Sequence, residues 1–343
     1  MPDRQIISAA VQEGELQFET SLRPQHLSEF AGQPKLKEVL SIAIQAARQR
    51  GEALDHVLFY GPPGLGKTTL ASIVANELGA EFQQTSAPIL QKKLDLTGVL
   101  SKIRLHQVFF IDEVHRLLAD VEEMLYAAIE DFRVDILVGT GPGARTHSLP
   151  IPRFTAIGAT TRQGMVSAPL LSRFGLVLRL NPYEVDDLTG IVLRSAKLLN
   201  AEVGHDGAQE IARRSRGTPR IANRLLRRVR DYAQVRADGR ITRQLAITAL
   251  DLLEVDRLGL DEIDQKIMAT VLEKYSGGPV GLNTIAASIN EESSTIEEVY
   301  EPYLMQLGFL DRTPRGRVAT ERAFQYFGIV PKLRGNPAQN NLF

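Results

Sequence analysis

The stretch YGPPGLGKTTLA, residues 60–71, constrains the fold more than any other part of the sequence. The apolar run HVLFY (56–60) before it predicts a buried strand, and the apolar spacing of residues 68–78 after it predicts a helix. A glycine-rich turn between a buried strand and an amphipathic helix is typical of a parallel α/β sheet. The same fold class is indicated by two further apolar runs and one further helical pattern: QVFFI (107–111), RFTAIGAT (153–160) and residues 121–129.

The turn itself matches a phosphate-binding loop, with Gly61, four intervening residues, and then Gly66, Lys67 and Thr68. Glycines let the backbone curl so that successive N–H groups face phosphate oxygens, and the helix that comes next adds its positive N-terminal end. In such a loop the lysine, here Lys67, reaches the β and γ phosphates of ATP, and the hydroxyl of Thr68 ligates Mg²⁺. The loop therefore predicts nucleotide binding.

This chemistry also requires an acid at the end of another buried strand, and VFFIDEVH, residues 108–115, supplies it. Four apolar residues predict a buried strand that ends at Asp112 and Glu113, at the carboxyl edge where α/β sheets bind ligands. We expect Asp112 to hold the water shell of the magnesium ion and Glu113 to polarise an attacking water. An aspartate alone would also suit a switch or a kinase, whereas the adjacent glutamate favours hydrolysis.

Phosphoryl transfer also needs positive charge on the γ-phosphate beyond one lysine and one Mg²⁺. Two arginines qualify by their position in the sequence: Arg173 in LLSRFG, just after the GATTR strand end, and Arg220 in RGTPR, at the start of a predicted helix. Taken alone, each could equally be a surface charge at a helix end.

The composition bounds the class of protein. A chain of 343 residues has room for two or three domains, and 40 Lys+Arg against 41 Asp+Glu argue against nucleic-acid binding through bulk charge. The absence of cysteine excludes disulfides and thiolate chemistry, and the six histidines show no metal-ligand spacing. The N-terminus lacks the pattern of a secretory signal, and no apolar run is long enough to span a bilayer, so we expect a cytoplasmic protein without membrane contact.

The chain is expected to divide into three folded parts. Residues 1–20 predict a flexible arm, and after Asn181 and Pro182 the strand patterns stop and helices are predicted from about 186, 206, 219 and 242. A third part begins near Leu258 with helices expected over 261–275, 282–290 and 294–307, followed by two β-prone arms in FLDRTPRGRVAT. Three helices followed by a small hairpin are typical of the winged-helix variant of DNA-binding domains.

GPPGLGKTT, IDEVH, GATTR, LLSRFG and GTPR, in this order, resemble the motifs of the AAA+ ATPases. With LRPQHLSEFAGQ near the front and RTPRGR near the end, the chain from about residue 18 to 335 resembles the bacterial members of this family that branch-migrate Holliday junctions. The resemblance implies a parallel-sheet AAA+ ATPase domain over 21–182, a helical lid domain over 183–256, a winged-helix domain over 257–335 and a tail over 336–343.

The resemblance also implies roles for individual residues. Gly64, Lys67, Thr68 and Thr69 bind ATP or ADP with Mg²⁺. Thr161 matches the sensor-1 position, with Thr160 as the alternative, and Arg220 matches sensor 2. Nucleotide contacts are also implied for Leu22 and Arg23 beside the adenine, for Tyr183 near the domain hinge, and for Glu130, Asp131 and Phe132.

Arg173 matches the arginine finger, which acts on the nucleotide of a neighbouring subunit. A finger in trans implies an assembly, and the resemblance implies a homo-hexameric ring around duplex DNA at a Holliday junction. The activity implied is that of an ATP-hydrolysing DNA helicase in recombination and repair. The partners implied are a junction-recognition protein of the RuvA type and a resolvase of the RuvC type.

RVDILVGTGPGARTHSLP, residues 133–150, has apolar arms around a Gly/Pro turn and predicts a hairpin that projects from the ATPase domain. An exposed apolar hairpin is an aggregation hazard unless it meets a partner, although it could instead fold back on its own domain. In the related motors such a hairpin docks the RuvA-type protein. The expected contacts are Ile136, Leu137 and Val138.

DRTPRGRVAT, residues 311–320, places Arg312, Arg315 and Arg317 around a proline and a glycine. By itself this is a solvated turn, but on the wing of a winged-helix domain its arginines would form an exposed loop that binds DNA phosphates without reading sequence. Two alternatives to the motor remain open: a clamp-loader-like AAA+ subunit, disfavoured because it would carry a helical collar instead of a wing, and a non-motor ATP-dependent switch that binds DNA.

Overall fold

The structure is a computed structural model that describes residues 21–138 and 145–330. The described residues form two compact units: 21–198 with 217–220, and 199–216 with 221–330. The predicted arm over 1–20, the tail over 336–343 and the last five residues of the predicted winged-helix domain lie outside the described residues. Within the described ranges no helix is both long and apolar enough to cross a membrane.

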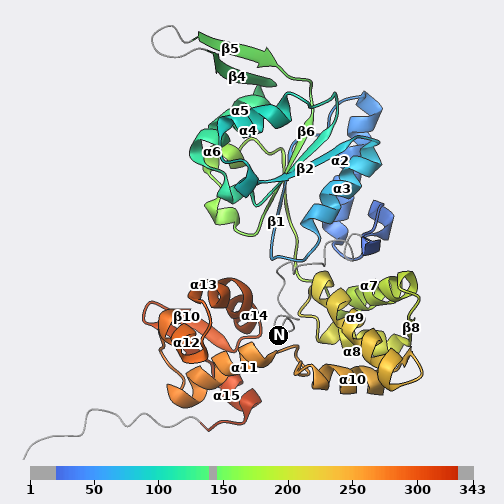
Figure 1. The fold of residues 1–343 in the computed structure, drawn as a ribbon, viewed down its shortest axis with the longest axis vertical. Helices are drawn as coiled ribbons and strands as arrows, with labels where there is room; N and C mark the ends of the chain where they lie inside the picture. Colours follow the sequence, from blue (N-terminus) through green and yellow to red (C-terminus); the bar gives the residue numbers. More distant parts are fainter. Residues whose placement is uncertain (1–20, 139–144, 331–343) are drawn as a thin grey trace, which may run out of the picture. The chain divides into compact units, whose positions relative to one another are not determined.

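The first unit is built on a five-stranded sheet in the order β2-β3-β6-β1-β7 (Figure 1). Every neighbouring pair in it is parallel, which confirms the predicted fold class. The sequence predicted three of its strands but not β2 or β7, because FQQTS is polar and LVLR is short. The strands are β1 (Val57–Tyr60), β2 (Phe82–Ser86), β3 (Val108–Asp112), β6 (Thr155–Thr160) and β7 (Leu176–Arg179).

Helices cover both faces of this sheet (Figure 1). α2 (Pro34–Arg50) and α3 (Lys67–Leu78) lie on one face, and α4 (Lys93–Leu100), α5 (Ala119–Glu130) and α6 (Ala168–Leu171) lie on the other. The helical spacing of Val121, Leu125 and Ala128 buries one side of α5 in a core that also holds Phe109 and Phe154. α7 (Val185–Leu198) completes the described helices of this unit.

The predicted hairpin is present as the antiparallel pair β4 (Arg133–Val138) and β5 (Arg145–Pro150), which comes directly after α5. Ile136 is half-buried and packs partly against the apolar core of its own domain. The side chains of Leu137 and Val138 lie outside the described residues.

The second unit contains the helices predicted from about 206, 219 and 242: α8 (His205–Arg213), α9 (Pro219–Arg236, with its first two residues in the first unit) and α10 (Arg243–Leu252). The expectation of no strands in this segment is wrong, because β8 (Glu202–Val203) and β9 (Arg240–Ile241) form a parallel pair. Strands of two residues are too short to leave an alternating pattern in the sequence.

The winged-helix order is found in the same unit. The elements are α11 (Glu262–Ala269), α12 (Leu282–Ile289), α13 (Ser293–Thr295), α14 (Glu301–Gln306), β10 (Leu310–Thr313), β11 (Gly316–Ala319) and α15 (Glu321–Phe327). A wide helical turn over 270–274 continues α11, and another over 296–300 joins α13 to α14. Val280 exchanges two backbone hydrogen bonds with Arg317, which adds a third strand segment beside the β10–β11 hairpin.

Candidate nucleotide-binding site

The glycine-rich loop leaves β1 in backbone conformations that suit glycine. Gly61, Gly64 and Gly66 have φ angles of 144°, 77° and 101°, and a Cβ added at Gly61 would lie 2.4 Å from the carbonyl oxygen of Leu180. The Gly61 N–H donates to the carbonyl oxygen of Thr160 at 3.2 Å, which joins the loop to the end of β6. Any side chain at Gly61 would therefore displace the loop from the sheet.

Lys67 begins α3, and its ammonium group turns back into the loop. Nζ donates to the carbonyl oxygens of Gly61 at 2.8 Å and Pro62 at 2.9 Å, and the residue is only 7% exposed. Burial lowers the pKa of Lys67 to about 8, against the opposing effect of Glu113 and Asp112. A buried cation held by carbonyl dipoles is a site prepared for an anion, because a phosphate would stabilise its charge directly.

The two acids lie where the sequence predicted them, at the end of β3. Glu113 has a φ of 52°, a conformation rare outside glycine, and its N–H donates to Oδ1 of Asp112 at 3.0 Å. Burial, followed by the neighbouring Glu113 carboxylate, raises the pKa of Asp112. A bound cation would offset both effects, so this edge of the sheet fits a hard metal ion.

Both candidate sensor threonines lie beside these acids. The Thr161 hydroxyl donates to Oε2 of Glu113 at 3.2 Å, whereas the Thr160 side chain is buried and lies 2.9 Å from Nδ1 of His115. The contact with Glu113 supports Thr161 for the sensor role. His115 was missed because the histidines were considered only as metal ligands.

Further predicted nucleotide contacts gather around the loop. The Arg220 N–H donates to the carbonyl oxygen of Gly64 at 3.4 Å, and the charge of Arg220 is close enough to lower the pKa of Lys67. The Tyr183 hydroxyl donates to the carbonyl oxygen of Leu65 at 3.1 Å. Thr68 and Thr69 lie in the first turn of α3.

Leu22 and Arg23 lie in a segment tied to the same unit. Leu22 is buried, and its carbonyl oxygen accepts a hydrogen bond of 2.7 Å from Arg194 on α7. The same arginine pairs with Glu29 at 3.2 Å. Arg194 therefore anchors this segment, a role that no sequence pattern indicated because its partners lie more than 160 residues away.

Arg173 lies in a different cluster. Its guanidinium pairs with Glu130 at 2.7 Å, donates to the carbonyl oxygen of Pro169 at 2.7 Å, and lies 4.5 Å from the ring centroid of Tyr126. None of these partners belongs to the phosphate loop. The structure thus pairs two predicted nucleotide contacts, Arg173 and Glu130, with each other and not with the phosphate loop.

Phe132 lies at the opposite edge of the sheet from the phosphate loop. Its ring packs against Phe154 and against His56, which immediately precedes β1, whereas the loop begins at the other end of that strand. Asp131 pairs with Arg133 at 3.2 Å. The structure therefore does not bring Phe132 to the phosphate loop of its own chain.

The residues present fit a magnesium nucleotide. No group of three His, Cys, Asp or Glu suited to a metal occurs in the described ranges. Magnesium in nucleotide sites is held by one or two protein oxygens together with phosphates and water, so Thr68 and Asp112 are a sufficient protein set.

The wing differs from the expected exposed loop. Arg315 and Arg312 are exposed, and Arg312 pairs with Glu297. Arg317 is only 8% exposed and donates to Oε2 of Glu301 at 2.8 and 3.1 Å, so the expectation of exposure is wrong for this residue. β10 and β11 place Arg312 directly opposite Arg317, and the two carboxylates offset the resulting repulsion.

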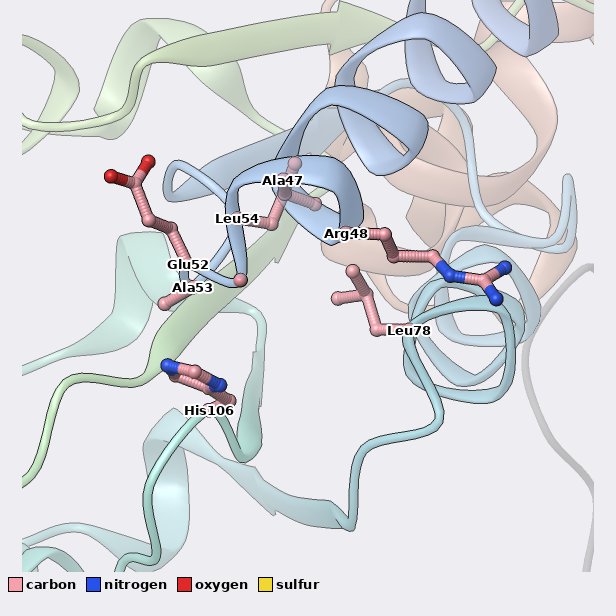
Figure 2. Close-up of a pocket in the computed structure, with 8 residues that line it drawn as sticks. Ala47, Arg48, Glu52, Ala53, Leu54, Leu78 and His106 are labelled. Carbon is pink, nitrogen blue, oxygen red and sulfur yellow. The ribbon is translucent and has the colours of Figure 1, made fainter.

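A cavity of about 270 Å³ lies at the amino edge of the sheet, lined by the ends of α2 and α3 and by His106 (Figure 2). Figure 2 shows Arg48 and Glu52 extending away from each other there. None of the predicted site residues lines it, and its polar groups do not converge on a common point.

Comparison with known proteins relates all three segments of the chain to the same family. Family models for the Holliday junction DNA helicase RuvB P-loop domain, the RuvB AAA lid domain and the RuvB C-terminal winged helix domain match residues 22–180, 183–256 and 257–328. The Holliday junction branch migration complex subunit RuvB of Solibacter usitatus is 75% identical over 334 residues, which cover 97% of each chain. That of Koribacter versatilis is 61% identical over 338 residues, which cover 98% of this chain and 93% of the relative.

Solved structures agree with the sequence relatives. The Thermotoga maritima RuvB Holliday junction branch migration motor has 50% sequence identity to this chain and a TM-score of 0.81. The match covers 90% of this chain and 99% of the solved one.

Proposed function

This chain belongs to the RuvB family of Holliday junction branch migration ATPases, and on that premise we propose that it works as a hexameric motor that moves duplex DNA through junctions in recombination and repair. A clamp-loader-like subunit would carry a helical collar as its third domain. The third domain here, residues 257–328, is instead a winged helix, which disfavours this alternative.

One observation carries the residue assignments: a single unit brings the buried cation, both acids and a sensor arginine within electrostatic reach of each other. Glu113, Asp112 and Arg220 each affect the pKa of Lys67. In this arrangement Lys67 binds the β and γ phosphates of ATP, Thr68 and Asp112 hold Mg²⁺, and Arg220 contacts the γ-phosphate. Mg²⁺ held by Thr68 and Asp112 would supply positive charge that offsets the charge developing on the phosphates.

Glu113 orients the attacking water in this proposal. Its carboxylate is held by Thr161, which matches the sensor position, so the base and the sensor face the same point at the end of β6. A carboxylate fixed beside the γ-phosphate position can accept a proton from water without reorganisation. The loss of the carboxylate charge in a Glu113→Gln variant is expected to stop hydrolysis and preserve ATP binding.

The contacts of Arg173 are an argument for the proposed hexameric assembly. Its partners are Glu130, Tyr126 and Pro169, not the loop of its own chain, so its proposed catalytic target is the ATP of the next subunit in a ring. Glu130 and Asp131 would then approach that same neighbouring nucleotide. Hydrolysis gated by assembly is a property expected of a ring motor, because an arginine finger contributes roughly 10³–10⁵ in rate.

We assign DNA contacts to the wing, with Arg312 and Arg315 as the exposed cations and Arg317 beside them. The proposed partners are four-way DNA junctions, a RuvA-type protein docked on the β4–β5 hairpin, and a RuvC-type resolvase. Ile136 to Val138 remain the predicted contacts of the RuvA-type protein.

The test is ATP-driven dissociation of a synthetic four-way junction, with and without a RuvA-type partner. Dissociation that requires ATP, increases with the partner and fails in Glu113→Gln supports the motor. ATP hydrolysis without any junction processing would contradict it and favour a switch.

A further inference from the structure

His115 occupies a position in the hydrolytic site that the proposed mechanism does not use. It lies in the short turn Val114–Arg116 directly after the acid pair, and the left-handed conformation of Glu113 turns the chain so that residue 115 comes back beside residue 113. The His115 side chain is almost fully buried. A buried imidazole beside a catalytic carboxylate requires an account of what it does there.

One ring nitrogen of His115 lies within hydrogen-bond distance of two groups. Nδ1 lies 3.1 Å from Oε2 of Glu113 and 2.9 Å from Oγ1 of Thr160. An ionised carboxylate only accepts hydrogen bonds, so the first contact requires a proton on Nδ1. Oγ1 of Thr160 also accepts the N–H of Arg162 at 3.0 Å, which fixes this hydroxyl at the end of β6.

We infer that His115 is a positioning residue for ATP hydrolysis: its Nδ1–H holds the Glu113 carboxylate against the sensor end of β6, beside Thr161. The inference rests on the proposed role of Glu113 as the group that activates water. His115 itself touches neither nucleotide nor water in this assignment and acts only through Glu113.

The Thr161 hydrogen bond and the close approach of His115 Nδ1 both fall on one oxygen of Glu113. His115 and Thr161 both contact Oε2, so Oε1 is the oxygen directed to receive the proton of the attacking water. A carboxylate held at one oxygen by two donors loses rotational freedom, and a base that is 1 Å out of place can cost about 100-fold in rate.

Thr160 connects this arrangement to the phosphate loop. Its side chain contacts His115, and its carbonyl oxygen accepts the N–H of Gly61, the first glycine of the loop. Polar contacts of Thr160 and His115 therefore connect the loop, the end of β6 and Glu113 in sequence. Through these contacts the position of the general base depends on the position of the loop that binds phosphate.

The experiment compares His115→Phe with His115→Asn in the full-length protein, with duplex DNA and saturating ATP. Phenylalanine keeps the ring volume but has no donor, whereas the side-chain N–H₂ of asparagine can occupy the place of Nδ1. We expect kcat to fall between about 10- and 100-fold in His115→Phe. The KM for ATP and the Kd of a fluorescent nucleotide should stay within about twofold, and His115→Asn should recover most of the rate.

Three results would overturn the inference. The kcat of His115→Phe could stay within twofold of the parent, or its kcat could fall together with an equal loss of nucleotide affinity. Alternatively, both variants could lose the same amount of kcat and the same amount of melting temperature. The last would make His115 a packing residue. His115→Phe added to Glu113→Gln should cause no further loss, because the positioned carboxylate is already absent.

The same series separates this inference from the proposed function. If Glu113→Gln hydrolyses ATP normally, the assignment of the base fails whatever His115 does. If Glu113→Gln is inactive and His115→Phe is fully active, only the positioning role fails.

Discussion

The phosphate loop and the wing, both proposed to bind phosphate, hold their cations in opposite ways. Burial lowers the pKa of Lys67 to about 8, although the carbonyl oxygens of its own loop accept hydrogen bonds from its ammonium group. Arg317 is equally buried, yet it is bound by the carboxylate of Glu301, which is 2% exposed. Lys67 is hydrogen-bonded to neutral carbonyl groups, whereas Arg317 is paired with a carboxylate.

The difference reflects what each cation must bind. A lysine that must capture one nucleotide tightly gains from being desolvated, because the incoming phosphate then supplies its main counter-charge. A wing that slides along any duplex, as proposed here, would need arginines of fixed geometry, and the carboxylates of Glu297 and Glu301 supply that geometry. Arg173, paired with Glu130, resembles the wing arginines in this respect.

Arg173→Ala gives the largest expected effect. ATP hydrolysis by the assembled protein should fall by about 10³–10⁵-fold with ATP binding retained, because the finger stabilises charge that exists only in the transition state. Steady-state hydrolysis and equilibrium nucleotide binding measure the two separately. The exposed Arg179→Ala is the matched control, and normal hydrolysis by Arg173→Ala would remove the trans-finger assignment.

Arg317→Ala should destabilise the winged-helix domain by about 3–5 kcal/mol, because it leaves Glu301 buried without its partner. Hydrogen exchange of the β10 and β11 amides would measure the loss. Replacing both residues, as Arg317→Met with Glu301→Leu, should restore most of the stability. If the single variant is as stable as the parent, the buried pair does not hold the wing.

Lys67→Met should weaken ATP binding by about 100-fold, near the upper value for a charged hydrogen bond, and yet stabilise the nucleotide-free protein. The pKa of Lys67 is lowered in the folded state from 10.5 to about 8, so its charged form is penalised there below pH 8. The variant should therefore exceed the parent by about 3 kcal/mol at pH 7, and the difference should vanish as the pH approaches 10.5.

Denaturant unfolding across this pH range, together with nucleotide titration, checks both halves of the prediction. A variant that binds ATP normally, or a stability difference that grows toward high pH, would show that the lysine is not a desolvated phosphate ligand.

Arg312→Ala gives the smallest expected effect. Affinity for duplex DNA should fall a few-fold for all sequences, and the slope of log affinity against log salt should decrease by about one. The exposed Arg322→Ala on α15 is the control. An unchanged slope in Arg312→Ala would make its contact with Glu297 a purely structural ion pair.

The phosphate loop, the acid pair and the order of the domains could be predicted because each depends on residues close together in the chain. Gly61 to Thr68 form their site from their own backbone, and Asp112 and Glu113 reach the sheet edge because the apolar residues before them must be buried. Helical spacing likewise revealed α5 and the helices of the lid and the winged helix. β2 was missed because its sequence is polar.

The sequence alone determined that this chain is a P-loop ATPase that carries a winged helix, since local geometry and burial dictate both patterns. Only the tertiary structure decided which of these side chains meet: Arg194 with Glu29, Arg173 with Glu130, Arg317 with Glu301, and His115 with Thr160. Such pairs join residues from different elements, and the free energy of a buried charge depends on which group the fold brings within about 3 Å of it.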